Sequence, residues 1–346
     1  MSTATGTHWK QRPEGGGPFA LWLIRTFALH VGRLPARLVL FPITLYFLLV
    51  RGPERRSSRA FLTRAFGRPA TLWEVARHIH TFAATILDRV FLLSEQFRRY
   101  DLHVHGLDAL HTELDKGRGV LLFGAHVGSF EALRVLSLKR PDISVRVVLD
   151  KSQSPALTQL LDALNPNIAS TVIDAAQPGT AIVLALKEAA DQKAAIGLLV
   201  DRAKPGEPAV ACPFFGAPAL FPSAPALIAA ALQIPVVLCF GLYRGRDRYD
   251  VHFETFSEGL VIPRNNRRDA LTAVLTRYAA RLEHYVRLAP YNWFNFYDFW
   301  NINAQTGDAQ VDRQETGAPR TAATAAAPAA GADDRNGIDV GRRGSA

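Results

Sequence analysis

Short apolar runs alternate with stretches of helical periodicity from residue 120 onward. Strands that alternate with helices in this way are typical of a parallel sheet covered by helices. We therefore expect an α/β fold with a largely parallel central sheet flanked by helices. The predicted strands are Val120–Phe123, Val145–Leu149, Ile168–Ile173, Ala195–Val200 and Val236–Leu242, and the predicted helices are Pro155–Leu164, Thr180–Asp191, Ala224–Leu232 and Arg268–Leu288.

The N-terminal part of the chain has a different pattern. Phe19 to Val50 is apolar but interrupted by arginines, and its uncharged run, Leu38 to Val50, would cover roughly 20 Å as a helix. The hydrocarbon core of a bilayer is about 30 Å thick, so this run is short for a span. We predict helices that lie in the membrane interface. A soluble helical hairpin packed on the domain is the alternative.

Periodicity and composition together suggest four regions. Apolar positions at helical spacing predict a helix over Thr71–Gln96 with Thr71 as its cap, and Gly52–Gly67 resembles an exposed basic helix. The segment after Ala304 has almost no large apolar side chain, so it cannot bury enough surface to fold. The predicted regions are a disordered leader (1–18), basic hydrophobic membrane-interfacial helices (19–67), an α/β domain (68–303) and a disordered tail (304–346).

Charge and cysteine content narrow the classes of partner. The 346 residues carry a formal net charge of +9, which predicts attraction to an anionic partner such as a membrane surface. The sequence has no RNA-binding signature, and no nucleic-acid partner is predicted. The two cysteines, Cys212 and Cys239, fit a reducing compartment and lack zinc-site spacing. His103 and His105 alternate on a predicted strand without a further ligand nearby, so we predict no metal and no cofactor.

The candidate chemistry lies just after the first predicted strand, where the run Gly119–Glu131 contains His126 and Glu131. On one helix this spacing would rotate the two side chains about 140° apart, so His126 must lie in the loop before the helix. Glu131 could then hold one imidazole nitrogen and leave the other to accept a proton. Ser129 does not fit the serine-hydrolase pattern G-x-S-x-G, because Phe130 and Glu131 follow it.

Two blocks of this chain resemble a known family. Gly-Ala-His-Val-Gly-Ser-Phe-Glu, which ends at Glu131, is similar to the H-x4-D/E block of the lysophospholipid acyltransferase superfamily. Asp201-Arg202, followed by Pro213 to Ala219 and Pro222 to Ala226, resembles the second block of its lipid A late acyltransferase branch (lauroyl/myristoyl type). The resemblance extends over roughly Phe19 to Trp300.

The resemblance implies an O-acyltransferase that moves a fatty acyl chain from an acyl thioester to a hydroxyl of a lipid or lysolipid. The donor would be acyl-carrier protein or acyl-CoA, and the protein would lie at the cytoplasmic face of a bacterial inner membrane. His126 would be the general base and Glu131 its orienting partner, with main-chain N–H groups near the following helix start or near Gly216 facing the oxyanion. The candidate substrate-binding residues are Arg202, Asp201, Gly216, Phe215 and Arg134.

One departure from the family concerns the acceptor. The family branch usually ends in Trp-Phe-Trp followed by His-Arg-Arg, whereas this chain has Asn292 to Asp298 without that basic cluster. An acceptor other than a phosphorylated lipid A precursor, such as an aryl polyene lipid, an aminolipid or another lysolipid, is therefore open. A second hypothesis from another class is a non-catalytic basic protein that binds membrane or RNA on an acyltransferase-like scaffold.

Overall fold

The fold is known from a computed structural model of the chain. It divides the chain into a unit of residues Met1–Ala309 and a second unit, Gln310–Ala346. The predicted leader, the tail from Ala304 and most of the predicted helix Pro155–Leu164 lie outside the described residues. The structure describes residues 30, 32–93, 98–134, 142–152, 158–159, 162, 170–204 and 206–302.

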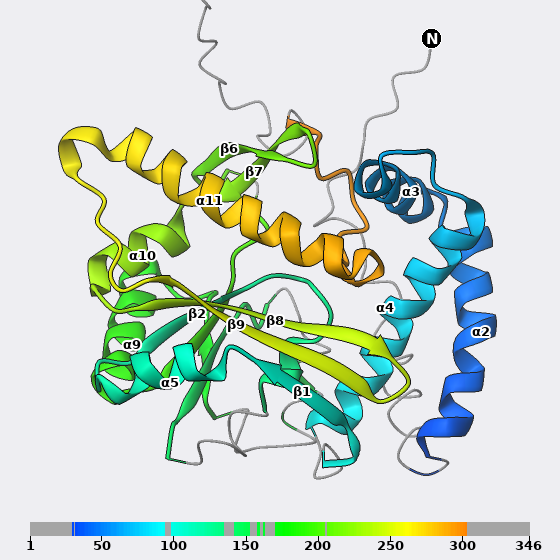
Figure 1. The fold of residues 1–346 in the computed structure, drawn as a ribbon, viewed down its shortest axis with the longest axis horizontal. Helices are drawn as coiled ribbons and strands as arrows, with labels where there is room; N and C mark the ends of the chain where they lie inside the picture. Colours follow the sequence, from blue (N-terminus) through cyan, green and yellow to red (C-terminus); the bar gives the residue numbers. More distant parts are fainter. Residues whose placement is uncertain are drawn as a thin grey trace, which may run out of the picture. The chain divides into compact units, whose positions relative to one another are not determined.

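A seven-stranded sheet forms the centre of the first unit (Figure 1). Its strand order is β1-β9-β8-β2-β5-β3-β4, and every neighbouring pair is parallel except β8 and β9. The predicted α/β class with a largely parallel sheet is therefore confirmed. The strands are β1 (Asp101–His105), β2 (Val120–Gly124), β3 (Val145–Leu149), β4 (Val172–Asp174), β5 (Ala195–Leu199), β8 (Val236–Gly245) and β9 (Arg248–Ser257).

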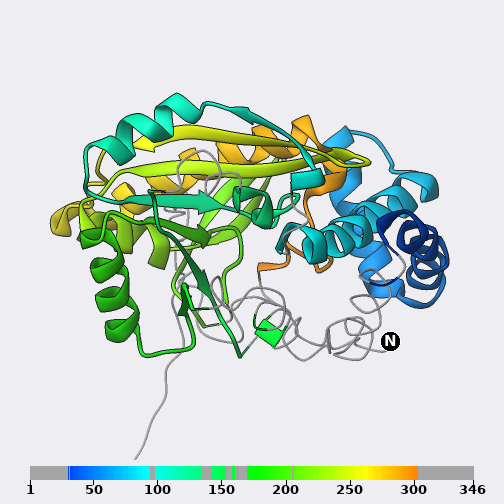
Figure 2. The same cartoon turned by 90° about the horizontal axis from the view of Figure 1, so that it is seen from below.

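Side chains of β2 alternate between two buried clusters, one on each face of the sheet, which shows that helices cover both faces. Leu121 and Phe123 pack in the cluster that includes side chains of α11, whereas Val120 and Leu122 pack with side chains of α5. Figure 2 gives the same arrangement seen from below. In the described part of the chain, the α-helices after the first strand are α5 (Leu107–Asp115), α9 (Gly179–Asp191), α10 (Ala224–Leu232) and α11 (Arg267–Leu288), and a 3₁₀ turn, η3, lies at Phe130–Arg134.

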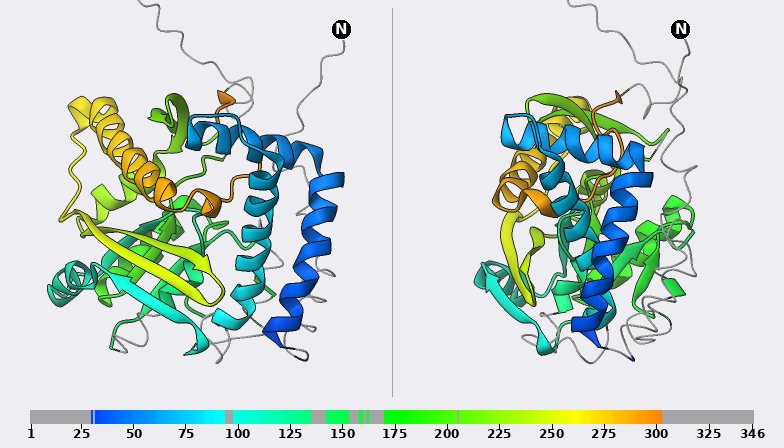
Figure 3. Two further views of the ribbon diagram at one scale, coloured as in Figure 1. Left: turned by 45° about the vertical axis from the view of Figure 1, so that its right-hand side comes forward. Right: turned by 90° about the vertical axis from the view of Figure 1, so that its right-hand side faces the viewer.

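Among the described residues, three helices precede the sheet: α2 (Arg33–Val50), α3 (Gly52–Phe66) and α4 (Leu72–Leu93). Figure 3 shows α2 and α4 side by side. Arg33 at the start of α2 donates to both carboxylate oxygens of the buried Asp88 in α4, at 2.9 and 3.1 Å. At the start of α4, Thr71 and Glu74 form a reciprocal capping box, which confirms Thr71 as the cap.

Several elements differ from the sequence predictions. The described part of the strand predicted at Ile168–Ile173 is β4, which begins at Val172. The pattern did not predict α5, β9 or the antiparallel hairpin of β6 (Ala209–Phe214) and β7 (Ala217–Pro222). β9 alternates polar and apolar residues and lies between β1 and β8 in the sheet. The helix expected after His126 is a 3₁₀ turn over its described residues.

Candidate active site

His126 and Asp201 meet because they follow the ends of two neighbouring parallel strands. β2 ends at Gly124 and β5 ends at Leu199, and these two residues are partners in the strand register. The amide of Val200 donates to the carbonyl of Gly124 at 3.0 Å, which extends the pairing beyond β5. His126 and Asp201 each lie two residues beyond the end of their strand. Loops at the carboxyl edge of parallel strands are where α/β proteins place functional side chains.

Asp201 fixes both the main chain and the ring of His126. The His126 amide donates to the two carboxylate oxygens at 3.2 and 3.1 Å, and Nδ1 lies 2.7 Å from Oδ1. Asp201 is fully buried, whereas the side chain of His126 is 29% exposed. Because the carboxylate can only accept, Nδ1 carries the proton and Nε2 holds the lone pair. Within the described part of the chain, no residue hydrogen-bonds Nε2.

Two residues from the C-terminal segment complete the surroundings of Asp201. The indole Nε1 of Trp293 donates to Oδ2 at 3.2 Å, and Nδ2 of Asn295 donates to the same oxygen at 3.1 Å. Burial alone would raise the pKa of Asp201, but His126, Arg202 and Asn295 outweigh it and hold that pKa far below its usual value. Asp201 therefore stays ionised while it orients the imidazole.

The base strength of His126 reflects opposing influences. Burial lowers the pKa of the imidazole, and the positive charge of Arg202 acts in the same direction. Asp201 offsets part of this effect, and the net pKa is below its usual value. The imidazole is therefore neutral at pH 7, as a proton acceptor must be.

Arg202 is held beside this pair by residues of the C-terminal segment. Its Nε donates to Oδ1 of Asn295 at 2.6 Å, and Nη2 donates to the carbonyl of Phe294 at 2.7 Å. The guanidinium also lies 5.9 Å from the centre of the Tyr297 ring. Asn295 therefore joins Arg202 to Asp201 through the two ends of one amide.

The expected contact between Glu131 and His126 is replaced by another pairing. Nε of Arg89, in α4, lies 2.6 Å from Oε1 of Glu131, and the Ser129 hydroxyl donates to Oε2 at 2.8 Å. No hydrogen bond joins His126 to Glu131 among the described residues. The prediction failed because it considered only the local chain, whereas the adjacent strand end supplies a carboxylate directly at the ring.

The loop that carries His126 is held by backbone contacts on two sides. The backbone amide of Gly128 donates to the carbonyl of Asn292 at 2.8 Å, and the backbone amide of Ser129 donates to the carbonyl of Gly241 at 2.8 Å. Gly128 has φ +62°, and a Cβ there would lie 1.9 Å from the Gly241 carbonyl oxygen. The amides of residues 127, 128, 129 and 132 all have backbone acceptors, so these N–H groups are not open to an oxyanion.

The remaining predicted substrate-binding residues are Phe215, Gly216 and Arg134, and the described ones, Phe215 and Gly216, form no hydrogen bond with His126 or Asp201. Phe215 and Gly216 form the turn of the β6–β7 hairpin, with φ of 50° and 76°. Phe215 is buried against Phe61, and its amide donates to Glu283 at 2.6 Å, so it packs in the core. The side chain of Arg134 lies outside what the structure describes.

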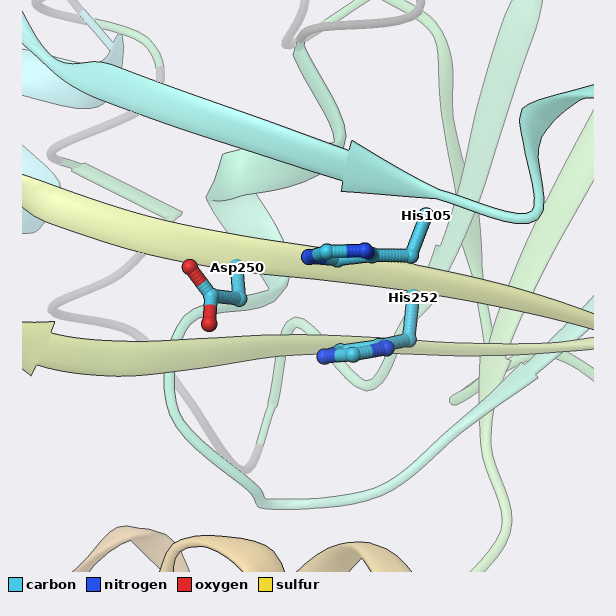
Figure 4. Close-up of side chains that lie close together, drawn as sticks. All are labelled: His105, Asp250 and His252. Atoms are coloured by element: carbon cyan, nitrogen blue, oxygen red, sulfur yellow. The ribbon is translucent and has the colours of Figure 1, made fainter.

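A second cluster of titratable groups lies at the β1 edge of the sheet (Figure 4). The rings of His105 and His252 stack with centres 4.5 Å apart, and one ligand atom from each, together with one from Asp250, lie within 4.8 Å of one another. Asp250 already accepts from Arg244 at 2.7 Å and Arg248 at 3.0 Å. Because two guanidinium charges offset this carboxylate, the cluster has little net attraction for a cation.

The fold and the His126–Asp201 pair define an α/β protein with an imidazole bound by a buried carboxylate at the carboxyl edge of its sheet. The model of the family described as bacterial lipid A biosynthesis acyltransferase matches residues 62–301, which include both blocks of the site. The chain belongs to this family. The family implies acyl transfer onto a lipid and a bacterial, membrane-associated setting. No curated protein matches the chain.

Proposed function

We propose that this protein transfers a fatty acyl chain from an acyl thioester, carried by acyl-carrier protein or coenzyme A, to a hydroxyl of a lipid or lysolipid. The proposal is supported chiefly by one observation: Nδ1 of His126 is bound by an ionised, buried Asp201, while Nε2 has no hydrogen-bond partner among the described residues. An imidazole in this tautomer is a general base for a hydroxyl.

In the proposed reaction His126 Nε2 removes the proton of the acceptor hydroxyl as its oxygen attacks the thioester carbonyl carbon. The tetrahedral intermediate then collapses, the C–S bond breaks, and the proton on Nε2 passes to the departing thiolate. The products are an ester and a free thiol, and the enzyme returns to its starting state. Positioned general-base catalysis of this kind contributes about 10² to 10⁴ in rate.

Arg202 is the group we propose for holding an anionic part of donor or acceptor. Asn295 and Phe294 hold its guanidinium from one side and fix its orientation. A planar guanidinium presents five N–H donors, so it can bind phosphate or carboxylate with donors not used in these bonds.

The membrane would be engaged by α2 from the cytoplasmic side of the inner membrane. Among the described residues, α2 is the one helix long and apolar enough to cross a bilayer. Ala36, Leu40 and Thr44 are buried on one side of α2. Ala36 and Leu40 share a buried cluster with side chains of α4, and the Thr44 hydroxyl lies 3.1 Å from Nδ1 of His80 in α4. We propose that the opposite side enters one leaflet while α2 stays packed on α4. The exposed apolar side chains on α2 are Leu34, Leu38, Val39, Phe41, Leu45, Tyr46, Leu49 and Val50.

The test of the reaction uses the purified full chain with radiolabelled acyl-carrier protein or acyl-CoA and bacterial lipid extract. Labelled lipid ester should form, and His126→Ala should lower turnover by at least about 10²-fold. His103→Ala is the matched control, because His103 lies on the exposed face of β1 and should leave turnover unchanged. Full turnover by the His126 variant would refute the general-base role. Absence of ester with either donor would favour the non-catalytic binding protein.

A further inference from the structure

We propose that Trp293 is a positioning residue for the active site, which sets the orientation and base strength of His126 by donating its indole N–H to Asp201. This inference rests on the proposed general-base role of His126. The indole Nε1 lies 3.2 Å from Oδ2 of Asp201, on the carboxylate whose other oxygen binds the imidazole. Trp293 belongs to the C-terminal segment in which this chain departs from the family's usual ending.

The indole is fixed by aromatic packing on several sides. Trp293 is fully buried, and its ring centre lies 4.8 Å from that of Phe61, 5.2 Å from Phe214 and 4.7 Å from Phe299. Edge-to-face contacts at these distances stabilise a particular ring orientation. A ring held in this way directs its N–H at Asp201 with little freedom to turn aside.

The main chain of Trp293 is held by a second buried histidine. Nε2 of His78 donates to the Trp293 carbonyl at 2.9 Å, and Nδ1 lies 2.8 Å from the hydroxyl of Ser58. Because a carbonyl can only accept, His78 carries its proton on Nε2, and Ser58 donates to Nδ1. Burial lowers the pKa of His78 to about 4, so this arrangement persists at neutral pH.

The same segment also holds the loop that carries His126. Val127 and Trp293 form an antiparallel bridge, and the amide of Phe294 donates to the carbonyl of His126 at 2.9 Å. Trp293 thus contacts both partners of the site: its backbone pairs beside His126, and its side chain binds Asp201. One residue can therefore fix the distance between imidazole and carboxylate.

The indole bond also has an electrostatic consequence. A donor on Oδ2 stabilises the carboxylate charge and weakens the pull of Asp201 on the imidazolium proton. Removal of this donor should therefore raise the pKa of His126. The other charged groups that act on His126 are Arg202 and Arg89, and neither contacts the indole through a hydrogen bond among the described residues.

The test compares Trp293→Phe with Trp300→Phe. Both changes remove an indole N–H from the same aromatic cluster, but the indole of Trp300 donates to the carbonyl of Phe214 at 3.0 Å and not to Asp201. Trp293→Phe should raise the pKa of His126 by about 0.5 to 1 unit, measured by NMR titration of the imidazole. The apparent pKa of the acid limb in the pH profile of kcat/KM should rise by the same amount, and kcat should fall by about 5- to 10-fold. Trp300→Phe should change none of these three quantities.

A second measurement uses the unmodified protein and does not depend on the variant folding. The indole N–H resonance of Trp293 should follow the titration of His126, while that of Trp300 should not. An unchanged His126 pKa in Trp293→Phe, or a Trp293 resonance insensitive to that titration, would overturn the positioning role. Because both readouts are spectroscopic, they remain decisive if no acyl transfer is detected, which would count only against the proposed reaction.

Discussion

At the scale of single residues, the site contains two carboxylates that could orient His126, and the structure distinguishes them. Asp201 accepts from the ring and main chain of His126, from Trp293 and from Asn295, whereas Glu131 is engaged by Arg89 and Ser129. An amide at position 201 would present N–H groups to these donors and lose the charge that stabilises the imidazolium. Asp201→Asn should therefore lower kcat by about 10² to 10⁴-fold.

Glu131→Gln is the matched change for the other carboxylate. It leaves the contact between Asp201 and His126 intact, so kcat should stay within a few-fold of wild type. It weakens the charged contact with Arg89, and the free energy of unfolding should fall by about 1–3 kcal/mol. Steady-state kinetics and urea denaturation of both variants provide the comparison. A large loss of kcat in Glu131→Gln with near-normal activity in Asp201→Asn would restore Glu131 as the orienting group.

At the scale of elements, the His126 loop depends on close backbone approach at Gly128. This glycine has φ +62°, and an added Cβ would lie 1.9 Å from the carbonyl oxygen of Gly241 in β8. Gly67, at the end of α3, has nearly the same φ, +65°, but no atom within 4 Å of an added Cβ. Gly67→Ala should thus cost only the left-handed backbone penalty, about 1–2 kcal/mol.

Gly128→Ala has the same backbone penalty and must also displace β8 or the loop. Its loss of unfolding free energy should clearly exceed that of Gly67→Ala, and its kcat should fall because the displaced loop carries His126. Chemical denaturation gives the first quantity and the acyl-transfer assay the second. Equal stability losses and unchanged kcat in both variants would mean that the loop accommodates the methyl group without moving.

The two strands that carry the site were predicted to within one residue at each end. Val120–Phe123 and Ala195–Val200 are continuous apolar runs, and they correspond to the buried strands β2 and β5. β9 alternates polar and apolar residues, and the sequence analysis did not predict it. The β6–β7 turn depends on positive φ at Phe215, which no residue preference predicts.

At the scale of the whole molecule, strand order decides which predicted residues meet. The sequence identified both His126 and the Asp201-Arg202 block, but not that β2 and β5 are neighbours. Many strand orders are compatible with one alternation of strands and helices, so local patterns cannot pair residues 75 positions apart. The contributions of Trp293 and Asn295 were missed for the same reason, because their segment reaches the site only through the tertiary fold.

Membrane attachment also depends on the whole molecule, because the packing of α2 on the domain decides which side of α2 stays uncovered. Leu38 on α2 is 68% exposed and Val261, before α11, is 70% exposed. If the outer side of α2 enters a leaflet, Leu38→Glu removes about 1.5–3 kcal/mol of apolar burial and adds a charge that resists insertion. Binding to anionic phospholipid vesicles should weaken by at least about 10-fold, because 1.4 kcal/mol corresponds to a factor of ten.

Val261→Glu introduces the same charge at an equally exposed position that lies outside α2, and it should leave vesicle binding within about 2-fold of wild type. Cosedimentation with vesicles at low and high salt measures both variants, and their unfolding curves verify that each is folded. Higher salt should weaken the attraction between arginine side chains and anionic headgroups in both variants. The difference between the variants should persist, because ions do not screen apolar insertion. If Leu38→Glu binds as tightly as Val261→Glu, α2 does not insert, and attachment relies on charge or on another segment.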